Sequence, residues 1–488
     1  MDNQKTSFKE KLDKYFKISE RGSNFKTEII AGLTTFFAMA YIVVTNPNQI
    51  VSFNRAGELN TIWLSVYVAS ILVAVVGTLL YAFYAKMPFA QACGMGLNSF
   101  FFVSFILPEV LSPTGDAMKG YKEGLAVILL SGILFMILSL TGLRQYIAKA
   151  LPENLKKAIP AGIGLFIAFL GFQNVGIIQA NQYTLVQLFD FHGAWTGASS
   201  TLESWRAIAP VIIAILGLIV MGVLSKLKVK GSVIITILGA TVVYYVAMWK
   251  APVFDFTSIG DSFKAFGQEG LFGAFDGFKT LFVPQGDEKL FGVILSAIML
   301  VITFTLVDMF DTIGTLYGAA SQADMLDEEG NPINMKESMN ADSIATVTGA
   351  ALGTSTCTTF VESSAGVGVG GRTGFASVIT AACFLACLFL TPIATIIPAC
   401  ATAPALIYIG VLMLKGFAKV DMEDITSAIP AFLTLIMMPL TYSISNGIAV
   451  GAISYVLIRL FTGKYQKKDI TVTIIAILFA LRFALITM

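Results

Sequence analysis

Two aspartates lie inside an apolar stretch of the sequence at a spacing that suits chemistry. Asp308 and Asp311 recur with Thr305, Thr312 and Thr315 at intervals of three and four residues, which places them on one stripe of a helix. A carboxylate at the centre of a membrane helix costs roughly 2.5 to 3.5 kcal/mol, so such groups are uncommon and usually functional. If the stripe served only to pack one helix against another through hydrogen bonds, threonines alone would be enough. The two acids therefore indicate a binding or proton-transfer site that faces protein or water.

A third acid, Glu362, lies in a segment of unusual composition. Polar and β-branched residues precede it at 354–359, and a glycine-rich run follows at 365–371. Because threonine is stiff and glycine disfavours helix, we expect a short extended stretch that leads into a half-helix beginning near Glu362. Irregular backbone at membrane depth is tolerated only where it is buried in protein or lines a cavity. The first N–H groups of the half-helix would then face a bound ligand. The alternative, an extramembrane glycine-rich loop, is disfavoured by the apolar runs on both sides.

Two more polar residues belong to similar surroundings. Asn98 follows Gly94 and Gly96 in an apolar segment, and its amide suits either a ligand or a hydrogen bond between helices. Asp342, just after Met339, either caps the N-terminus of a short helix or accepts a proton near the site. Both pairs of interpretations remain open at this point.

Composition excludes most other classes of protein. Of the 488 residues, 56% are hydrophobic and 13% charged, about half the charged share of a soluble domain, and the net charge is +1. The chain thus has a membrane composition and no basic surface for nucleic acid. His192, in a polar stretch, is the single histidine, so proton chemistry within the membrane must use carboxylates. The five cysteines lie in apolar segments without zinc spacing, which predicts buried thiols and no metal site.

The apolar segments predict a polytopic all-α membrane protein. With about 20 residues per span, the sequence contains about fourteen segments. They begin near Ile29, Ile62, Pro88, Leu125, Ala158, Ala207, Ser232, Leu290, Met339, Thr356, Phe375, Ala401, Ile425 and Ala449. A last stretch at 470–488 either inserts or lies at the interface. Lysine and arginine gather in the N-terminal tail and in alternate loops, with Arg144, Lys149 and Lys230 among them. Both termini are therefore expected on the cytoplasmic side of the cell membrane.

The two halves of the chain show signs of a repeat. Seven spans per half is an odd number, so repeated halves must be inverted relative to each other. Cysteine, then a polar residue five positions on, then serine occurs in the third segment (Cys93, Asn98, Ser99) and in the tenth (Cys357, Glu362, Ser363). We therefore predict a 7+7 inverted repeat with discontinuous helices at the third position of each half.

These motifs together resemble one family. The runs 307–314 (VDMFDTIG), 94–100 (GMGLNSF) and 359–366 (TFVESSAG) are similar to those of the nucleobase–cation symporter 2 (xanthine/uracil permease) superfamily. The opening run 31–42 (AGLTTFFAMAYI) resembles its AzgA-like purine permease branch. The resemblance extends over nearly the whole chain, from about Phe25 to Gly463.

The resemblance implies a core domain and a gate domain, with short antiparallel strands in segments 3 and 10 and the substrate between them. The implied divisions are a cytoplasmic tail at 1–26, core at 27–143 and 290–398, gate at 144–250 and 399–463, an extracytoplasmic loop at 251–289 and a C-terminal tail at 464–488. A homodimer through the gate domains is also expected.

The same resemblance assigns roles to the acids. Substrate contacts are expected from Glu362, Asp311 and Asn98, with Phe360, Ser363 and Thr359 beside them; proton coupling is expected from Asp308, Asp311 and Asp342. Because these acids lie close together, they would titrate as a group. Uracil and xanthine members often carry a histidine near the acid of the eighth span. Its absence here favours a purine such as guanine or hypoxanthine.

We therefore expect a permease, and not an enzyme, that imports guanine or hypoxanthine by proton symport through alternating access. The proton is the coupling ion, and no cofactor is expected. An adenine permease of the same branch is the alternative. An anion transporter would want a basic or neutral site, and a channel does not need the two-half symmetry. A membrane hydrolase would need a water-activating partner for Asp308 and Asp311.

Overall fold

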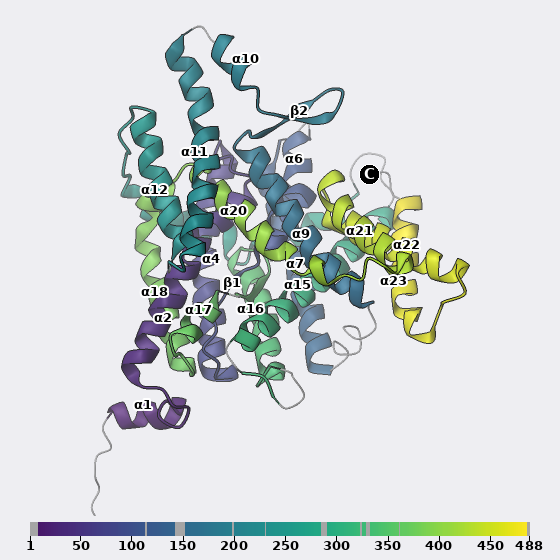
Figure 1. Cartoon of the computed structure of the whole chain (residues 1–488), viewed down its shortest axis with the longest axis horizontal. Helices are drawn as coiled ribbons and strands as arrows, with labels where there is room; N and C mark the ends of the chain where they lie inside the picture. The colour runs from purple at the N-terminus through teal and green to yellow at the C-terminus, as the bar shows by residue number, and fades with distance from the viewer. Residues whose placement is uncertain are drawn as a thin grey trace, which may run out of the picture.

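The computed structural model describes residues 8–112, 115–141, 152–197, 200–229, 231–284, 290–322, 325–327, 332–360 and 362–485. Among them, eight helices are long and apolar enough to cross a membrane, and shorter apolar helices accompany them. Figure 1 shows these helices side by side, with α1 (Phe8–Phe16) lying across one end of the bundle. The β2–β3 hairpin (Ile178–Asn181 and Leu185–Leu188) and α10 (Phe191–Thr196) lie at the other end.

The helices and strands follow the predicted segments in order. In the first half these are α2 (Phe25–Met39) with α3 (Ile42–Ile50), α4 (Glu58–Leu80) with η1 (Tyr81–Ala85), β1 (Gln91–Cys93) with α5 (Met95–Phe101), η2 (Phe102–Ile106) and α6 (Leu107–Leu111), then α7 (Ala117–Thr141), α9 (Glu153–Asn174), α11 (Thr201–Lys226) and α12 (Ser232–Ala247). In the second half they are α15 (Leu290–Gln322), α16 (Met335–Leu352), β4 (Cys357–Thr359) with α17 (Ser363–Gly368), α18 (Gly374–Ala386) with η4 (Cys387–Leu390) and α19 (Thr391–Thr395), then α20 (Ala399–Leu414), α21 (Ile425–Leu440) and α22 (Ile444–Phe461). Outside the halves lie α13 (Thr257–Ala265), η3 (Phe266–Gly270), α14 (Gly273–Leu281) and α23 (Ile470–Leu485), with the short turns η5 (Phe417–Lys419) and η6 (Lys467–Asp469).

The third and tenth segments meet as a pair of buried strands. β1 and β4 are antiparallel, with Cys93 opposite Cys357 and Gln91 opposite Thr359. The pairing continues beyond the strands, because Gly94 N–H donates to the carbonyl of Thr356 at 2.8 Å. Backbone polar groups within a membrane must be satisfied inside the protein. Each broken helix therefore supplies the hydrogen bonds that the other lacks, and the predicted strands are confirmed.

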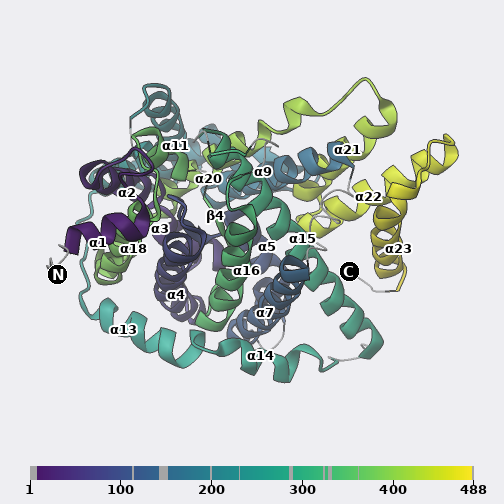
Figure 2. The same ribbon diagram turned by 90° about the horizontal axis from the view of Figure 1, so that it is seen from below.

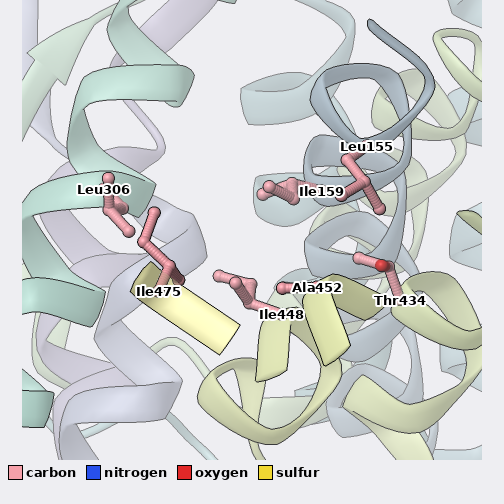
Figure 3. A pocket seen from close by; sticks show the side chains of 7 residues that line it. All are labelled: Leu155, Ile159, Leu306, Thr434, Ile448, Ala452 and Ile475. Carbon is pink, nitrogen blue, oxygen red and sulfur yellow. The ribbon is translucent and has the colours of Figure 1, made fainter. Parts of the chain in front are cut away.

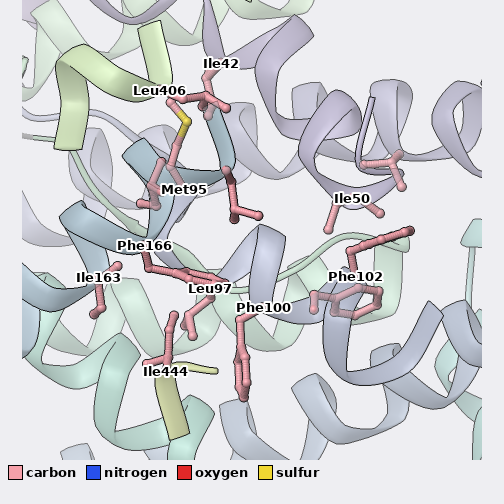
Figure 4. Packing of buried hydrophobic residues seen from close by; sticks show 14 of the residues in the cluster. Ile42, Ile50, Met95, Leu97, Phe100, Phe102, Ile163, Phe166, Leu406 and Ile444 are labelled. Carbon is pink, nitrogen blue, oxygen red and sulfur yellow. The ribbon is translucent and has the colours of Figure 1, made fainter. Parts of the chain in front are cut away.

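The helices of the two halves pack in two groups. One contains α2, α4, α7, α15, α16, α17 and α18, and the other contains α9, α11, α12, α20, α21 and α22. Apolar side chains fill the boundary between them. Figure 4 shows Met95 and Leu97 of α5 near Ile163 and Phe166 of α9, with Leu406 of α20 close by. We call the first group the core and the second the gate.

The structure confirms the polytopic helical fold and corrects one local interpretation. Asp342 does not cap a helix, because α16 begins at Met335, seven residues earlier, after the N-cap Asn334. The residues before Met339 are polar and partly exposed, with Lys336 exposed and Ser338 buried, and they continue the helix because lysine and glutamate are good helix formers. The stretch at 470–485 forms α23, which packs on α22 and α15. The expected boundary at 143/144 lies outside the described residues, as do Arg144, Lys149 and Lys230.

Candidate functional site

Asp311 lies beside the strand pair. A β-carbon placed on Gly94 would be 3.7 Å from Asp311 Oδ2 and 3.5 Å from Thr356 Oγ1, so the carboxylate reaches the end of β1. Within the described part of the chain no side chain donates a hydrogen bond to this carboxylate, and the buried Thr356 hydroxyl has no partner there either. Two polar groups with spare capacity thus converge where the backbone leaves the first strand.

Glu362 occupies the N-cap of α17, directly after the second strand. The hydroxyl of Tyr41 donates to its Oε1 at 2.8 Å. Tyr41 lies in the turn between α2 and α3, so the break in the first span contacts the break in the tenth. Helix α17, which begins just after Glu362, packs against α15, the helix that carries Asp311. A carboxylate accepts up to about four hydrogen bonds, so Glu362 keeps capacity for a ligand.

The other two acids are held by protein. Asp308 Oδ2 accepts from the Thr346 hydroxyl at 3.0 Å. Asp342 Oδ1 accepts from Gln91 Nε2 at 2.7 Å, and its Oδ2 accepts from the hydroxyl of Thr312. Both carboxylates are buried. Asp308 thus links α15 to α16, and Asp342 links α16 to both β1 and α15.

Asn98 does not face Glu362. Its Nδ2 donates to Gln49 Oε1 at 3.0 Å, and its Oδ1 accepts from the hydroxyl of Ser355. Ser355 precedes β4 whereas Glu362 follows it, so the two polar residues lie at opposite ends of the strand pair. Antiparallel pairing causes this, because each strand leads into its half-helix in the opposite direction. Asn98 therefore makes one hydrogen bond between helices, to Gln49 of α3, as the sequence left open, and a second to the segment that precedes β4.

Three residues expected near the substrate are tied to the protein frame. The Thr359 hydroxyl is 2.6 Å from the Tyr81 hydroxyl. Phe360 N–H donates to the carbonyl of Ala90 at 3.1 Å, and the Phe360 side chain is buried. Ser363 Oγ accepts from Ala90 N–H at 3.0 Å. Their hydrogen bonds fix the course of the chain on both sides of Glu362.

Sequence reasoning missed Tyr41, Gln91 and the polar face of α3. Thr45, Asn46, Asn48 and Gln49 are all buried, and Gln49 Nε2 has no partner within the described residues. The available signal was a polar run of residues 45–49 inside the first span. Gln91 was visible as a second amide, seven residues before Asn98, in the apolar third segment.

A separate apolar cavity lies between the gate and the core. Figure 3 shows Leu306 of α15 facing Ile475 of α23, with Leu155, Ile159, Ile448 and Ala452 around them. Thr434 supplies the polar atom among the lining side chains. The carboxylates described above are not among the lining residues, so this cavity is distinct from the acidic site.

Comparison with known proteins gives a consistent result. A family model described as "Permease family" matches residues 26–450. The adenine permease AdeP of Escherichia coli is 35% identical over 99% of this chain and 98% of its own. The guanine/hypoxanthine permease PbuO of Bacillus subtilis is 37% identical over 95% of this chain and 98% of its own. Among solved structures, the transmembrane domain of a cyanobacterial bicarbonate transporter, BicA, gives a TM-score of 0.57. That match has 14% identity and covers 87% of this chain and 97% of that domain, so it concerns the fold alone.

Proposed function

Because the chain belongs to this permease family, the nucleobase–cation symporter 2 family, we propose that it carries purine nucleobases across the membrane by secondary active transport. The observation that carries the proposal is the pair of acceptors beside the strands. Among the described residues no side chain donates a hydrogen bond to the Asp311 carboxylate, and Glu362 accepts one from Tyr41. Guanine presents adjacent N–H donors and hypoxanthine presents one beside a carbonyl. A carboxylate accepts such donors strongly in a site shielded from water.

Guanine and hypoxanthine are the proposed substrates, and adenine is the second candidate. Relatives of similar identity transport either class. The preference rests on donor geometry. The N1–H group and the 2-amino group of guanine lie side by side and can donate two parallel hydrogen bonds to one carboxylate. An inorganic anion is disfavoured, because four acids surround the strand pair: Asp308, Asp311, Asp342 and Glu362.

The substrate is tested by uptake in cells without their own purine carriers. Cells that express this chain should accumulate labelled hypoxanthine, and excess unlabelled guanine should compete more strongly than adenine. Stronger competition by adenine would identify the second candidate. Uptake of bicarbonate or sulfate without purine uptake would refute the proposal.

Glu362→Gln tests the site. This variant should lose hypoxanthine uptake while it reaches the membrane at the normal level, because an amide accepts fewer hydrogen bonds and carries no charge. Asp421→Asn, at an exposed acid far along the chain, is the matched control and should retain uptake. Near-normal uptake by Glu362→Gln would remove this residue from the site.

Proton symport is the proposed coupling. Burial disfavours the charged form of a carboxylate, so grouped acids can bind and release a proton during each cycle. A protonophore should collapse purine accumulation, and replacement of sodium by choline should not. The opposite result would indicate a sodium symporter. The cytoplasmic position of the termini and a gate-domain homodimer remain predictions.

A further inference from the structure

The segment between α12 and α15 forms two helices rather than a loose loop. Helices α13 and α14, joined by η3, run along one edge of the molecule outside α4, α7 and α16 (Figure 2). We call residues 257–281 the belt. Its two faces differ sharply in side-chain size.

The inner face of the belt consists of small residues pressed against the core. These are Ser258, Ser262, Ala265, Gly270, Gly273, Ala274 and Gly277. A β-carbon on Gly277 would lie 1.9 Å from the carbonyl oxygen of Lys122, and one on Gly270 would lie 2.3 Å from Ser65 Oγ. A side chain at Gly277 would collide with the backbone of α7, and one at Gly270 would collide with the Ser65 side chain, so the belt lies in close contact with the core.

Polar contacts fasten the belt to the same helices. Phe272 N–H donates to the carbonyl of Ala351 at 2.7 Å. Lys122 Nζ of α7 lies 2.8 Å from Glu269 Oε2 and 3.8 Å from Asp276 Oδ2. All these partners belong to the core, so these contacts tie the belt to the core.

The outer face of the belt is aromatic and uncovered. Phe263 is 41% exposed, Phe272 58% and Phe275 56%, and Phe256, just before the belt, is 73% exposed. Exposed charged residues, Asp261 among them, lie at other angles of the same helices. An apolar face bordered by charges is the pattern of a helix that lies in a membrane interface.

The depth of the belt along the spanning helices fits that position. Ser65 is seven residues from the start of α4 at Glu58, and Lys122 is five residues from the start of α7 at Ala117. At 1.5 Å per residue, the belt contacts lie about 8 to 10 Å below the ends of these helices. Helices α4 and η1 together span 28 residues, or about 42 Å, which matches a bilayer with its headgroups. The contacts therefore fall near the boundary between headgroups and hydrocarbon.

We propose that the belt lies in the plane of the membrane interface with its phenylalanines in phospholipid, and that it guides the core as the core moves against the gate. The occupant of the aromatic face is lipid, because that face lies beside spanning helices at interfacial depth. Phenylalanine is among the side chains that interfacial helices bury at the boundary between headgroups and acyl chains. The inference does not depend on which substrate is carried.

Spin-label accessibility in phospholipid nanodiscs tests the proposal. Labels at Phe263→Cys and Phe275→Cys should collide with oxygen and be protected from a water-soluble nickel chelate. Asp261→Cys is the matched control, because residues 261 and 263 differ by about 200° around one helix, and it should be open to the chelate. A Cys383→Ala background is used, since the other native cysteines are buried.

Each outcome is decisive. Chelate access at Phe263 and Phe275 equal to that at Asp261 would overturn the proposal, since the face would lie in water. Protection from both oxygen and chelate would also overturn it, because a protein such as a second copy would then cover the face.

Transport gives a second readout. Phe275→Asp should lower the maximal uptake rate severalfold with little change in the substrate concentration for half-maximal uptake, while Phe275→Leu should retain the rate. A changed half-maximal concentration with an unchanged rate would contradict a guiding role. A chain that transports no purine would still give the same label accessibilities, so failure of the proposed function is distinguishable.

Discussion

Two regions of the core hold a carboxylate inside the protein, Glu28 fully buried and Asp311 half-buried, and they differ in the donors that surround it. Glu28 of α2 lies at the start of α18, where Oε1 accepts from Arg372 N–H at 2.8 Å. Its Oε2 accepts from the Thr373 hydroxyl at 2.8 Å and from the N–H groups of Thr373 and Ala376, each at 3.3 Å. Asp311, beside the strands, receives no side-chain hydrogen bond from the described residues.

The difference separates structure from function. A buried carboxylate whose oxygens accept hydrogen bonds from the protein stabilises the fold. A carboxylate inside the protein without such donors raises the free energy of the folded state unless a ligand supplies the hydrogen bonds. Glu28 accepts hydrogen bonds from the otherwise unpaired N–H groups at the start of α18, and it thereby joins the first span to the eleventh. Asp311 and Glu362 keep acceptor capacity that the described residues do not fill. The acids were recognisable in the sequence, but only their partners show which are available to a substrate.

Replacing Asp311 by asparagine should have the largest effect. We expect hypoxanthine uptake to fall about 100-fold, equivalent to about 2.8 kcal/mol, because an amide cannot carry the charge or the proton. Thermal stability should hold, since no described residue makes a hydrogen bond to the Asp311 side chain that would be lost. Uptake at equal membrane levels and melting in detergent measure the two effects. A strong loss of stability with near-normal uptake would show that Asp311 is structural.

Glu28→Gln should show the reverse. One oxygen replaces two, so at least one buried donor loses its acceptor, at a cost of about 1 to 3 kcal/mol. The melting temperature should fall, while uptake per folded molecule stays close to normal. If the melting temperature is unchanged and uptake is lost, Glu28 belongs with the transport residues instead.

The sequence predicted the general plan because each of its parts has a local signature. Apolar length marks the spans, and the polar residues before Glu362 mark the broken helix. The sequence could not show that Asn98 lies at the other end of the strand pair from Glu362, because that depends on strand direction. Nor could it show that Asp342 is held by Gln91 and Thr312, which come from different segments. Long-range contacts such as these follow from packing and not from local pattern.

Gly94→Ala would test the space beside Asp311. A β-carbon there would lie 3.3 Å from Thr358 Cγ2 and 3.7 Å from Asp311 Oδ2, and the backbone at φ −69° accepts alanine. The chain should fold, but the methyl group would occupy room for the base, and the half-maximal uptake concentration should rise about tenfold, or about 1.4 kcal/mol. Gly222→Ala, where a β-carbon meets nothing within 4 Å, is the control. Unchanged uptake by Gly94→Ala would place the substrate elsewhere.

Tyr41→Phe should have the smallest effect and would sharpen the contrast between the two regions. It removes the 2.8 Å hydrogen bond to Glu362 and little else, because the ring stays buried. A hydrogen bond to a charged group contributes about 1.5 to 3 kcal/mol, but the substrate can occupy the freed acceptor, so we expect only a severalfold rise in the half-maximal concentration. If protein donors filled the acceptor positions of Glu362 as they fill those of Glu28, the loss of the Tyr41 hydroxyl would instead lower the melting temperature. Melting and uptake of the same preparation therefore decide whether Tyr41 positions a binding group or only packs the break in the first span.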